Sequence, residues 1–189
     1  MQKERGMKHK SLTFCKFSVT EPFLYLQLFL ILILAVIDRI LKIYMTEFLS
    51  GVTRVEFIPH FMHFTYIENT GASFGILKNQ ETFLSIVTFI ILIFLLYFIV
   101  SKRSKSKILD TALILIAAGG LGNLYDRVFH GYVVDYLEFS FVNYAVFNFA
   151  DALVNIGAVL LFIYLIFIDK RIFEKKAKDT KDFGEEQDV

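Results

Sequence analysis

Carboxylates and amides recur in separate stretches of the chain, each close to an apolar block. The polar residues in question are Asp38 and Lys42, Asn69, Asn123 with Asp126 and Arg127, Asp135, and Asn148 with Asp151. Two carboxylates placed a few ångströms apart cannot both ionise easily, so such a pair holds one proton near neutral pH. One member then serves as a general base and the other as a general acid. Water-mediated peptide hydrolysis without a covalent intermediate needs this combination.

The elements that must position these residues are four apolar blocks, at residues 23–45, 83–100, 108–125 and 145–168. A membrane-spanning helix needs about 20 predominantly apolar residues. Hydrophobic residues make up 56% of the 189 residues, whereas a soluble domain has about 45–50% even with glycine included. The sequence therefore predicts an all-α membrane protein with four transmembrane helices.

Composition also excludes several classes of protein. The single Cys15 rules out a disulfide scaffold, and the apolar content rules out a disordered chain. Basic residues do not interleave with aromatic ones as they do on nucleic-acid-binding surfaces, so we expect no nucleic-acid partner.

Charge patterning predicts the orientation in the membrane. Most of the 20 Lys and Arg residues lie in the N-terminal arm, in the loop after the second block and in the C-terminal tail. The positive-inside rule places these segments, and hence both termini, in the cytoplasm. Residues 41–82 and 126–144 then face outward, and the polar residues gather near the outer face.

The first outward segment is more than a linker. Residues 53–58 and 63–68 are rich in β-branched and aromatic side chains, and Pro59 stands between them. This pattern predicts a short pair of strands. We therefore expect a cytoplasmic arm at residues 1–22, a four-helix transmembrane domain at residues 23–169 with an outer β region at about residues 50–75, and a charged cytoplasmic tail at residues 170–189.

Five short motifs resemble those of the lipoprotein signal peptidase family (signal peptidase II) and occur in the family's order. They are Asp38-x-x-x-Lys42, Asn69-Thr70-Gly71-Ala72-Ser73-Phe74, Gly122-Asn123-Leu124-Tyr125-Asp126-Arg127, Val133-Val134-Asp135-Tyr136 and Phe147-Asn148-Phe149-Ala150-Asp151. Any one motif is weak evidence, but five in order on a four-span layout are strong.

The resemblance implies an intramembrane aspartic endopeptidase of the bacterial cytoplasmic membrane. Such enzymes remove the signal peptide from diacylglyceryl-modified prolipoproteins, just before the lipidated cysteine. The resemblance assigns catalysis to Asp135 and Asp151, and it implies a small outward-facing β-cradle. It also implies substrate-binding or supporting roles for Asp38, Lys42, Asn69, Gly71, Asn123, Arg127, Asn148 and Ala150. The expected partners are the diacylated prolipoprotein and membrane lipids, and we expect a monomer without a cofactor.

Alternative interpretations remain open from the residues alone. A small proton-coupled transporter or channel subunit could use Asp38, Asp126 and Asp151 as a relay, although a relay should have polar residues through the whole membrane depth. A non-catalytic membrane scaffold is a third possibility. Asp126 could simply form an ion pair or cap the third helix.

Metal and nucleophile chemistry have little support in the sequence. His60, His63 and His130 occur without an H-E-x-x-H motif, so we predict no metal site. There is no G-x-S-x-G motif either, and Cys15 is predicted to be cytoplasmic.

Overall fold

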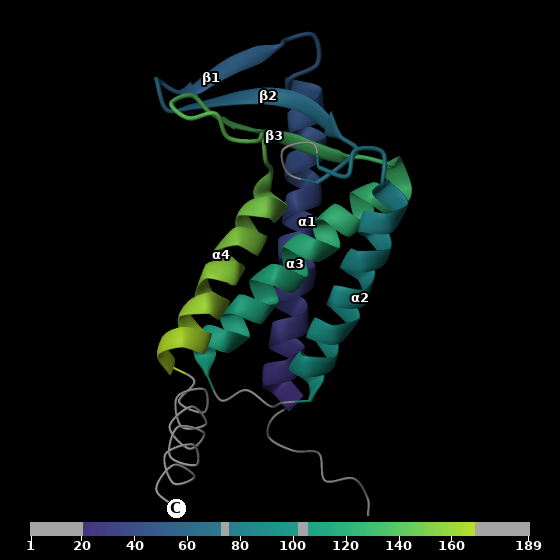
Figure 1. Cartoon of the computed structure of the whole chain (residues 1–189), viewed down its shortest axis with the longest axis vertical. Coiled ribbons are helices and arrows are strands. Elements are labelled where there is room, and N and C mark those ends of the chain that lie inside the picture. Colours follow the sequence, from purple (N-terminus) through teal and green to yellow (C-terminus); the bar gives the residue numbers. More distant parts are fainter. Residues whose placement is uncertain (1–20, 73–75, 102–105, 169–189) are drawn as a thin grey trace, which may run out of the picture.

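Four long helices and one small sheet make up the computed structural model, which describes residues 21–72, 76–101 and 106–168. The helices are α1 (Glu21–Phe48), α2 (Glu81–Val100), α3 (Lys107–His130) and α4 (Phe149–Ile163), the last continuing as the π-helical turn η2 (Tyr164–Ile168). The sheet lies across one end of the helix bundle (Figure 1). The predicted cytoplasmic arm and tail fall almost wholly outside the described residues, as does Cys15.

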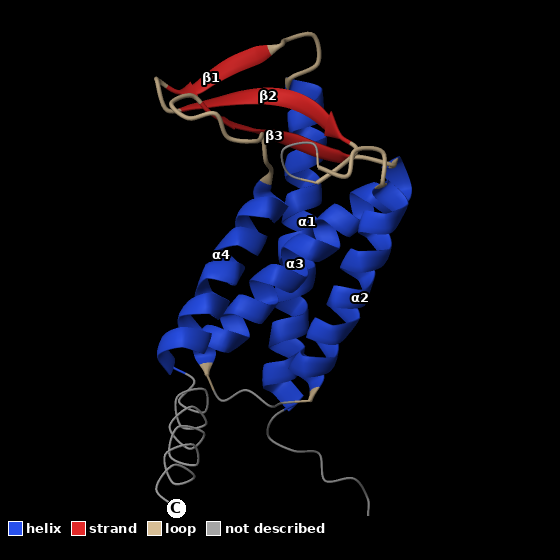
Figure 2. Cartoon of the chain, viewed as in Figure 1, coloured by secondary structure: helices blue, strands red, loops and turns tan. Residues whose placement is uncertain are grey.

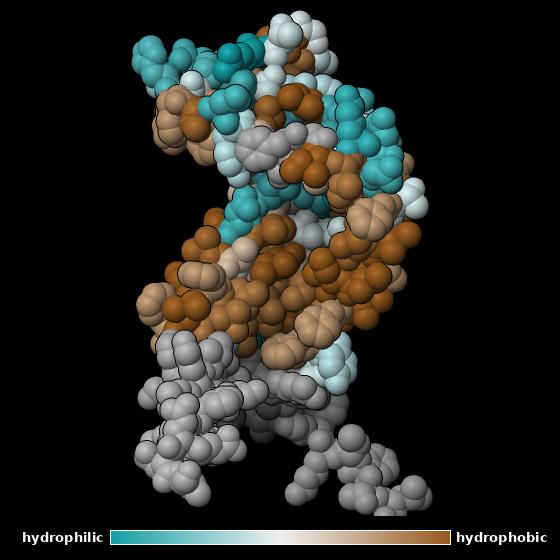
Figure 3. All heavy atoms as spheres, in the orientation of Figure 1, coloured by the Kyte–Doolittle hydropathy of each residue, from teal (hydrophilic) through white to brown (hydrophobic). Residues whose placement is uncertain are grey.

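All four helices are long and apolar enough to cross a membrane. Figure 3 shows hydrophobic side chains over the helices, hydrophilic ones on the sheet, and a recess between the two. Large side chains such as Phe29, Phe94 and Phe162 are exposed on the helix surfaces, as expected of groups that face lipid. These features confirm the predicted fold class, a four-helix membrane protein with a small sheet.

Helix α3 is the central element, because it packs against α1, α2 and α4. It begins at the N-cap Ser106, whose side chain accepts a hydrogen bond from the Leu109 backbone N–H. It ends at Gly131, which adopts a left-handed conformation with φ of 79°. The helix therefore extends beyond the apolar block that ends at residue 125, and Asp126 and Arg127 lie near its end, where their helical spacing with Gly122 and Asn123 places them.

The sheet consists of β1 (Arg54–Ile58), β2 (Met62–Asn69) and β3 (Val133–Phe139), all antiparallel and in that spatial order. Figure 2 shows the three strands, in red, above the upper ends of the helices. Strands β1 and β2 confirm the strand pair that the sequence predicts. Strand β3 adds to the predicted pair, because residues 133–139 of the second outward segment pair with β2.

The start of α4 also differs from the prediction. The fourth apolar block was expected to begin at residue 145, but the helix begins at Phe149. The preceding Phe147 is extended and forms an isolated β-bridge with Leu137 of β3. This bridge fixes the first turn of α4 against the sheet, and that placement matters for the polar site.

Candidate active site

The two aspartates that sequence analysis singles out come from different elements at the same end of the bundle. Asp135 lies in β3 and is only 2% exposed. Asp151 lies in the first turn of α4 and is partly buried. Both are held by one side chain, because Asn148 bonds to each of them. The structure thus brings the predicted pair together through a shared amide.

Asn148 is the N-cap of α4 and forms a capping box with Asp151. Its Oδ1 accepts the Asp151 backbone N–H at 2.9 Å, and Asp151 Oδ2 accepts the Asn148 backbone N–H at 3.1 Å. Its Nδ2 donates to Asp135 Oδ1 at 2.6 Å. The motif that starts the helix therefore also orients both carboxylates.

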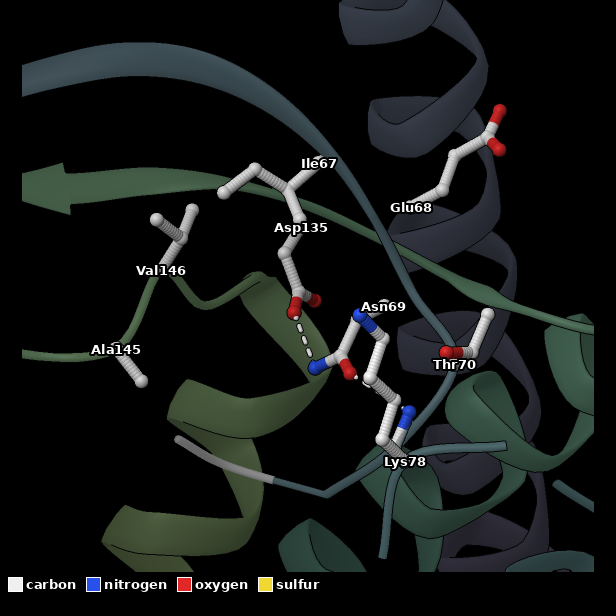
Figure 4. Close-up of a pocket in the computed structure, with 9 residues that line it drawn as sticks. Ile67, Glu68, Asn69, Thr70, Lys78, Asp135, Ala145 and Val146 are labelled. Atoms are coloured by element: carbon white, nitrogen blue, oxygen red, sulfur yellow. Dashed lines mark hydrogen bonds between the residues drawn. The ribbon is translucent and has the colours of Figure 1, made fainter. Parts of the chain in front are cut away.

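Two further amides complete the contacts of the carboxylates. Asn69, at the end of β2, donates from Nδ2 to Asp135 Oδ2 at 2.8 Å (Figure 4), while its Oδ1 accepts the Gly71 backbone N–H at 2.9 Å. Asn123 of α3 donates from Nδ2 to Asp151 Oδ1 at 2.7 Å. Each carboxylate thus receives hydrogen bonds from side chains that are themselves held in place.

Lys42 lies beneath these amides and is fully buried, with 0% exposure. Its Nζ lies 2.8 Å from Asp38 Oδ2, 2.8 Å from Asp126 Oδ2 and 2.9 Å from Asn123 Oδ1. The first two contacts are ion pairs, and the third is a hydrogen bond that Lys42 donates. Lys42 therefore fixes the side chain that binds Asp151.

Asp38 connects α1 to the start of α4. Its Oδ1 accepts the backbone N–H of Ala150 at 2.9 Å, and this N–H is one of the donors that a helix N-terminus leaves free. The Asp38 carboxylate and the Ala150 backbone thus join α1 to the first turn of α4, and the supporting roles that the resemblance implies for both residues stay predictions.

Asp126 forms ion pairs, which confirms one of the two simple roles considered for it. In addition to Lys42, it contacts Arg39 Nη1 at 3.2 Å. Arg39 has no role in the predicted site. Its position inside an apolar block nevertheless indicates an acidic partner, because a charge without a partner is costly there.

Electrostatics at Asp135 favour a shared proton. Burial, and after it the neighbouring charge of Asp151, raises the pKa of Asp135 to about 7. Hydrogen bonds from Asn69 and Asn148 act in the opposite direction. A carboxyl group with this pKa can exchange a proton near neutral pH, as a general acid or base must.

Each of the two aspartates lines a cavity of its own. One has a volume of about 300 Å³ and is lined by Asp135 together with Asn69, Gly71 and Lys78. The other, of about 220 Å³, lies among α2, α3 and α4 and is lined by Asp151, Arg127 and apolar side chains. Each carboxylate is therefore reachable from a separate cavity.

Gly71 and Arg127 lie between these cavities. Arg127 Nη2 donates to the Gly71 carbonyl at 3.2 Å, while the buried Arg127 Nε has no hydrogen-bond partner among the residues that the structure describes. A Cβ on Gly71 would come within 2.8 Å of the Ile76 carbonyl oxygen, so a side chain would not fit. Position 71 therefore requires glycine. The Nε–H donor of Arg127 is available to a further ligand.

The histidines considered for a metal lie apart from this site. His63 of β2 contacts Arg54 and Ser140, and His130 contacts Arg39. Within residues 21–72, 76–101 and 106–168, no three His, Cys, Asp or Glu side chains are grouped so that they could hold a metal ion.

Fold and site together define a polytopic membrane protein with a buried cluster of carboxylates and amides at one end of its helix bundle. A family model described as signal peptidase (SPase) II matches residues 30–167. The chain belongs to this family and is therefore a peptidase.

Similar proteins agree with this assignment. A lipoprotein signal peptidase of Clostridium novyi (strain NT) is 39% identical over 134 residues, which cover 69% of this chain and 90% of that protein. One from Clostridium tetani (strain Massachusetts / E88) is 34% identical over 155 residues, with 78% and 99% covered. A bacterial membrane enzyme solved by the in meso method at 2.3 Å resolution aligns with a TM-score of 0.68 at 32% identity, covering 76% of this chain and 89% of that one.

Proposed function

We propose that this protein is an aspartic endopeptidase that removes signal peptides from diacylglyceryl-modified prolipoproteins, cleaving just before the lipidated cysteine. Its membership of the signal peptidase II family and its relatives named lipoprotein signal peptidases support this function. The observation that carries the mechanism is the bridging of Asp135 and Asp151 by Asn148. A transporter is not favoured, because none of these relatives is named as one.

The proposed reaction uses Asp135 and Asp151 as a pair that carries one proton. The ionised carboxylate takes a proton from a water molecule as the water oxygen attacks the scissile carbonyl carbon. The protonated carboxyl group donates its proton to the carbonyl oxygen, which gives a neutral tetrahedral diol. The diol then returns a proton through the pair to the amide nitrogen as the C–N bond breaks. Acid and base exchange roles between the two steps.

Supporting residues keep the pair in position during these proton transfers. Asn69 and Asn148 hold Asp135, and Asn123 holds Asp151. Fixed dipoles of this kind stabilise charge without having to reorganise during the reaction. The free Nε of Arg127 is suited to a backbone carbonyl of the substrate, since a guanidinium group only donates.

The two cavities suggest the path of the substrate. The cavity among α2, α3 and α4 has apolar walls and leads to Asp151, so it suits the apolar signal segment. The cavity beside Asp135 lies at the sheet and suits the residues around the cleavage point. A chain that runs from one cavity into the other passes both aspartates.

Orientation in the membrane belongs to the same proposal. We place the sheet and the site at the outer face of the bacterial cytoplasmic membrane and both termini in the cytoplasm. The concentration of Lys and Arg in the arm, the inner loop and the tail supports this orientation. We further propose that the protein acts as a monomer, because the described residues of one chain supply both aspartates and their amides.

The test is cleavage of a purified diacylated prolipoprotein by wild type, Asp135→Asn and Asp151→Asn. Each variant should lose turnover by at least about 10⁴-fold, because a carboxamide can neither accept nor return the proton. Glu138→Gln serves as a matched control, since Glu138 lies on β3 like Asp135 but forms an ion pair with Arg54 on the sheet. Turnover retained by either Asn variant, with the membrane-inserted protein intact, would refute the mechanism.

A further inference from the structure

Arg39 is a charged residue within the membrane-spanning helix α1, and its side chain is partly exposed at the protein surface. Its side chain is 31% exposed, whereas those of Asp38 and Lys42 on the same helix are at most 1% exposed. Nη1 donates to Asp126 Oδ1 at 3.2 Å, Nη2 donates to His130 Nε2 at 3.1 Å, and the guanidinium carbon lies 5.3 Å from the centre of the Tyr125 ring. These bonds use two of the five N–H donors of an arginine, so others are available to a ligand.

Two cavities meet at Arg39, and their walls differ in chemistry. The larger, of about 500 Å³, extends from Arg39 toward the sheet. Its polar lining consists of Thr46, Glu47, Ser50, His130 and Tyr132, in addition to Arg39. The smaller, of about 340 Å³, extends from Arg39 toward the middle of the bundle, between α1 and α3, and is lined by Leu32, Ala35, Val36, Leu121 and Tyr125. A polar cavity continued by an apolar groove along a membrane helix fits an amphiphile.

The charges in the larger cavity point to one class of headgroup. Arg39 and His130 offer donors for a phosphate, because His130 accepts from Arg39 at Nε2 and so carries its own proton at Nδ1 when neutral. Glu47 offers a carboxylate, with the Thr46 and Ser50 hydroxyl groups nearby on the same helix. A headgroup that carries both a phosphate and a primary ammonium complements this arrangement of charges.

We propose that this surface binds a phospholipid of the phosphatidylethanolamine type from the outer leaflet. The phosphate lies on Arg39 and His130, the ammonium group lies on Glu47, and one acyl chain follows the groove past Ala35. The site is separate from the aspartate pair, since Gly120 and Asn123 of α3 line the cavity of Asp151, whereas Leu121 and Tyr125 line the groove. The bound lipid would contact the active site only indirectly, through Asp126 and Lys42.

Lipid binding can be measured on the purified full chain by native mass spectrometry. The probes are phosphatidylethanolamine, phosphatidylglycerol and diacylglycerol with identical acyl chains. We expect affinity to fall in that order, and Arg39→Gln to weaken phosphatidylethanolamine binding at least about tenfold, to the level of diacylglycerol. Glu47→Gln should remove the preference for phosphatidylethanolamine over phosphatidylglycerol but keep the preference of both over diacylglycerol. Arg54→Gln, which breaks an ion pair with Glu138 on the sheet, should change none of these affinities.

Ala35→Phe provides a second variant that leaves the Arg39–Asp126 ion pair intact. The added ring fills the groove, so binding of all three lipids should fall, and this result holds even if Arg39→Gln does not fold. Glycerophosphoethanolamine, which has the headgroup without acyl chains, should not displace the lipid at equal concentration.

Several results would overturn the proposal. Equal affinity of wild type for diacylglycerol and phosphatidylethanolamine would contradict it, and so would displacement of the lipid by the free headgroup. Unchanged lipid binding by a folded Arg39→Gln variant or by Ala35→Phe would contradict it as well. A dimer of wild type that Ala35→Phe dissociates would instead assign the groove to a second copy of the chain.

Discussion

Asn148 shows why an amide rather than a third acid stands between the two aspartates. Its Oδ1 accepts the backbone N–H of Asp151, while its Nδ2 donates to Asp135 and, at 3.3 Å, to Asn123 Oδ1. An amide offers an acceptor and a donor on one short, planar group, which a carboxylate does not. An aspartate at this position would turn an oxygen toward the Asp135 carboxylate and repel it, so side-chain type is strictly constrained at this position.

Asp135 should make both activity and stability depend on pH. Because its pKa is raised to about 7, the folded protein keeps a proton that the unfolded chain has lost above about pH 4. Turnover should therefore fall as the pH rises through about 7. The free energy of unfolding should also decrease from about pH 4 to pH 7, relative to Asp135→Asn, by on the order of 4 kcal/mol at most.

Thermal unfolding of wild type and Asp135→Asn in detergent, at a series of pH values, measures this difference. The substitution also lowers the stability of the variant at every pH, because its new N–H₂ group faces an N–H donor of Asn69 or Asn148 instead of accepting from it. The informative quantity is therefore the change of the difference with pH. A difference that stays constant between pH 4 and pH 8 would contradict the raised pKa.

At the scale of elements, the close approach of α3 and α4 positions Asp151 beside Asn123. Two glycines allow it. A Cβ on Gly119 would overlap the Ala150 carbonyl oxygen, and one on Gly157 would lie 2.7 Å from Ile116 Cγ1 and 2.9 Å from the Ala112 carbonyl oxygen. Backbone atoms cannot move aside as a flexible side chain can. The spacing of the two helices therefore depends on the absence of side chains at these positions.

Gly157→Ala should separate α3 from α4 and lower both stability and turnover. Overpacking of this kind costs about 1–3 kcal/mol. Gly120→Ala is a matched control on α3, because its Cβ would meet only the end of the Leu92 side chain, at 3.3 Å. Thermal unfolding should show a loss for Gly157→Ala and little change for Gly120→Ala, and prolipoprotein cleavage should fall for Gly157→Ala. Equal effects of the two substitutions would argue against a special role for the α3–α4 contact.

At the scale of the whole molecule, buried charges connect three helices into one network. Lys42 and Arg39 of α1 face Asp38 of the same helix and Asp126 of α3, so two cations balance two carboxylates. Asp38 also binds the backbone of α4 through Ala150. A buried charge is tolerated when it is paired and hydrogen-bonded. The network therefore holds α1, α3 and α4 together at the level of Asp135 and Asp151.

Lys42→Met should be strongly destabilising, because it leaves Asp38 and Asp126 facing each other with one cation fewer. Breaking a buried ion pair from one side costs about 3–5 kcal/mol. The double variant Asp38→Asn with Lys42→Met removes one charge of each sign and should recover part of the loss. Turnover should stay low in both variants, since Asn123 loses the ammonium group that orients it toward Asp151. Thermal unfolding and cleavage measure the two effects, and wild-type stability of Lys42→Met would contradict the network.

The amino-acid sequence by itself determined the four helices, the first two strands and the set of polar residues that form the site. Each of these follows from a local pattern: the length of an apolar block, the β-branched and aromatic side chains of residues 53–58 and 63–68, or a short motif. Only the tertiary structure decided how these parts meet. Strand β3 forms because residues 133–139 pair with β2, which lies more than sixty residues earlier in the chain. The ion pair of Arg39 with Asp126 spans 87 residues. Such contacts depend on the packing of helices and on burial, and neither is encoded in the spacing of neighbouring residues.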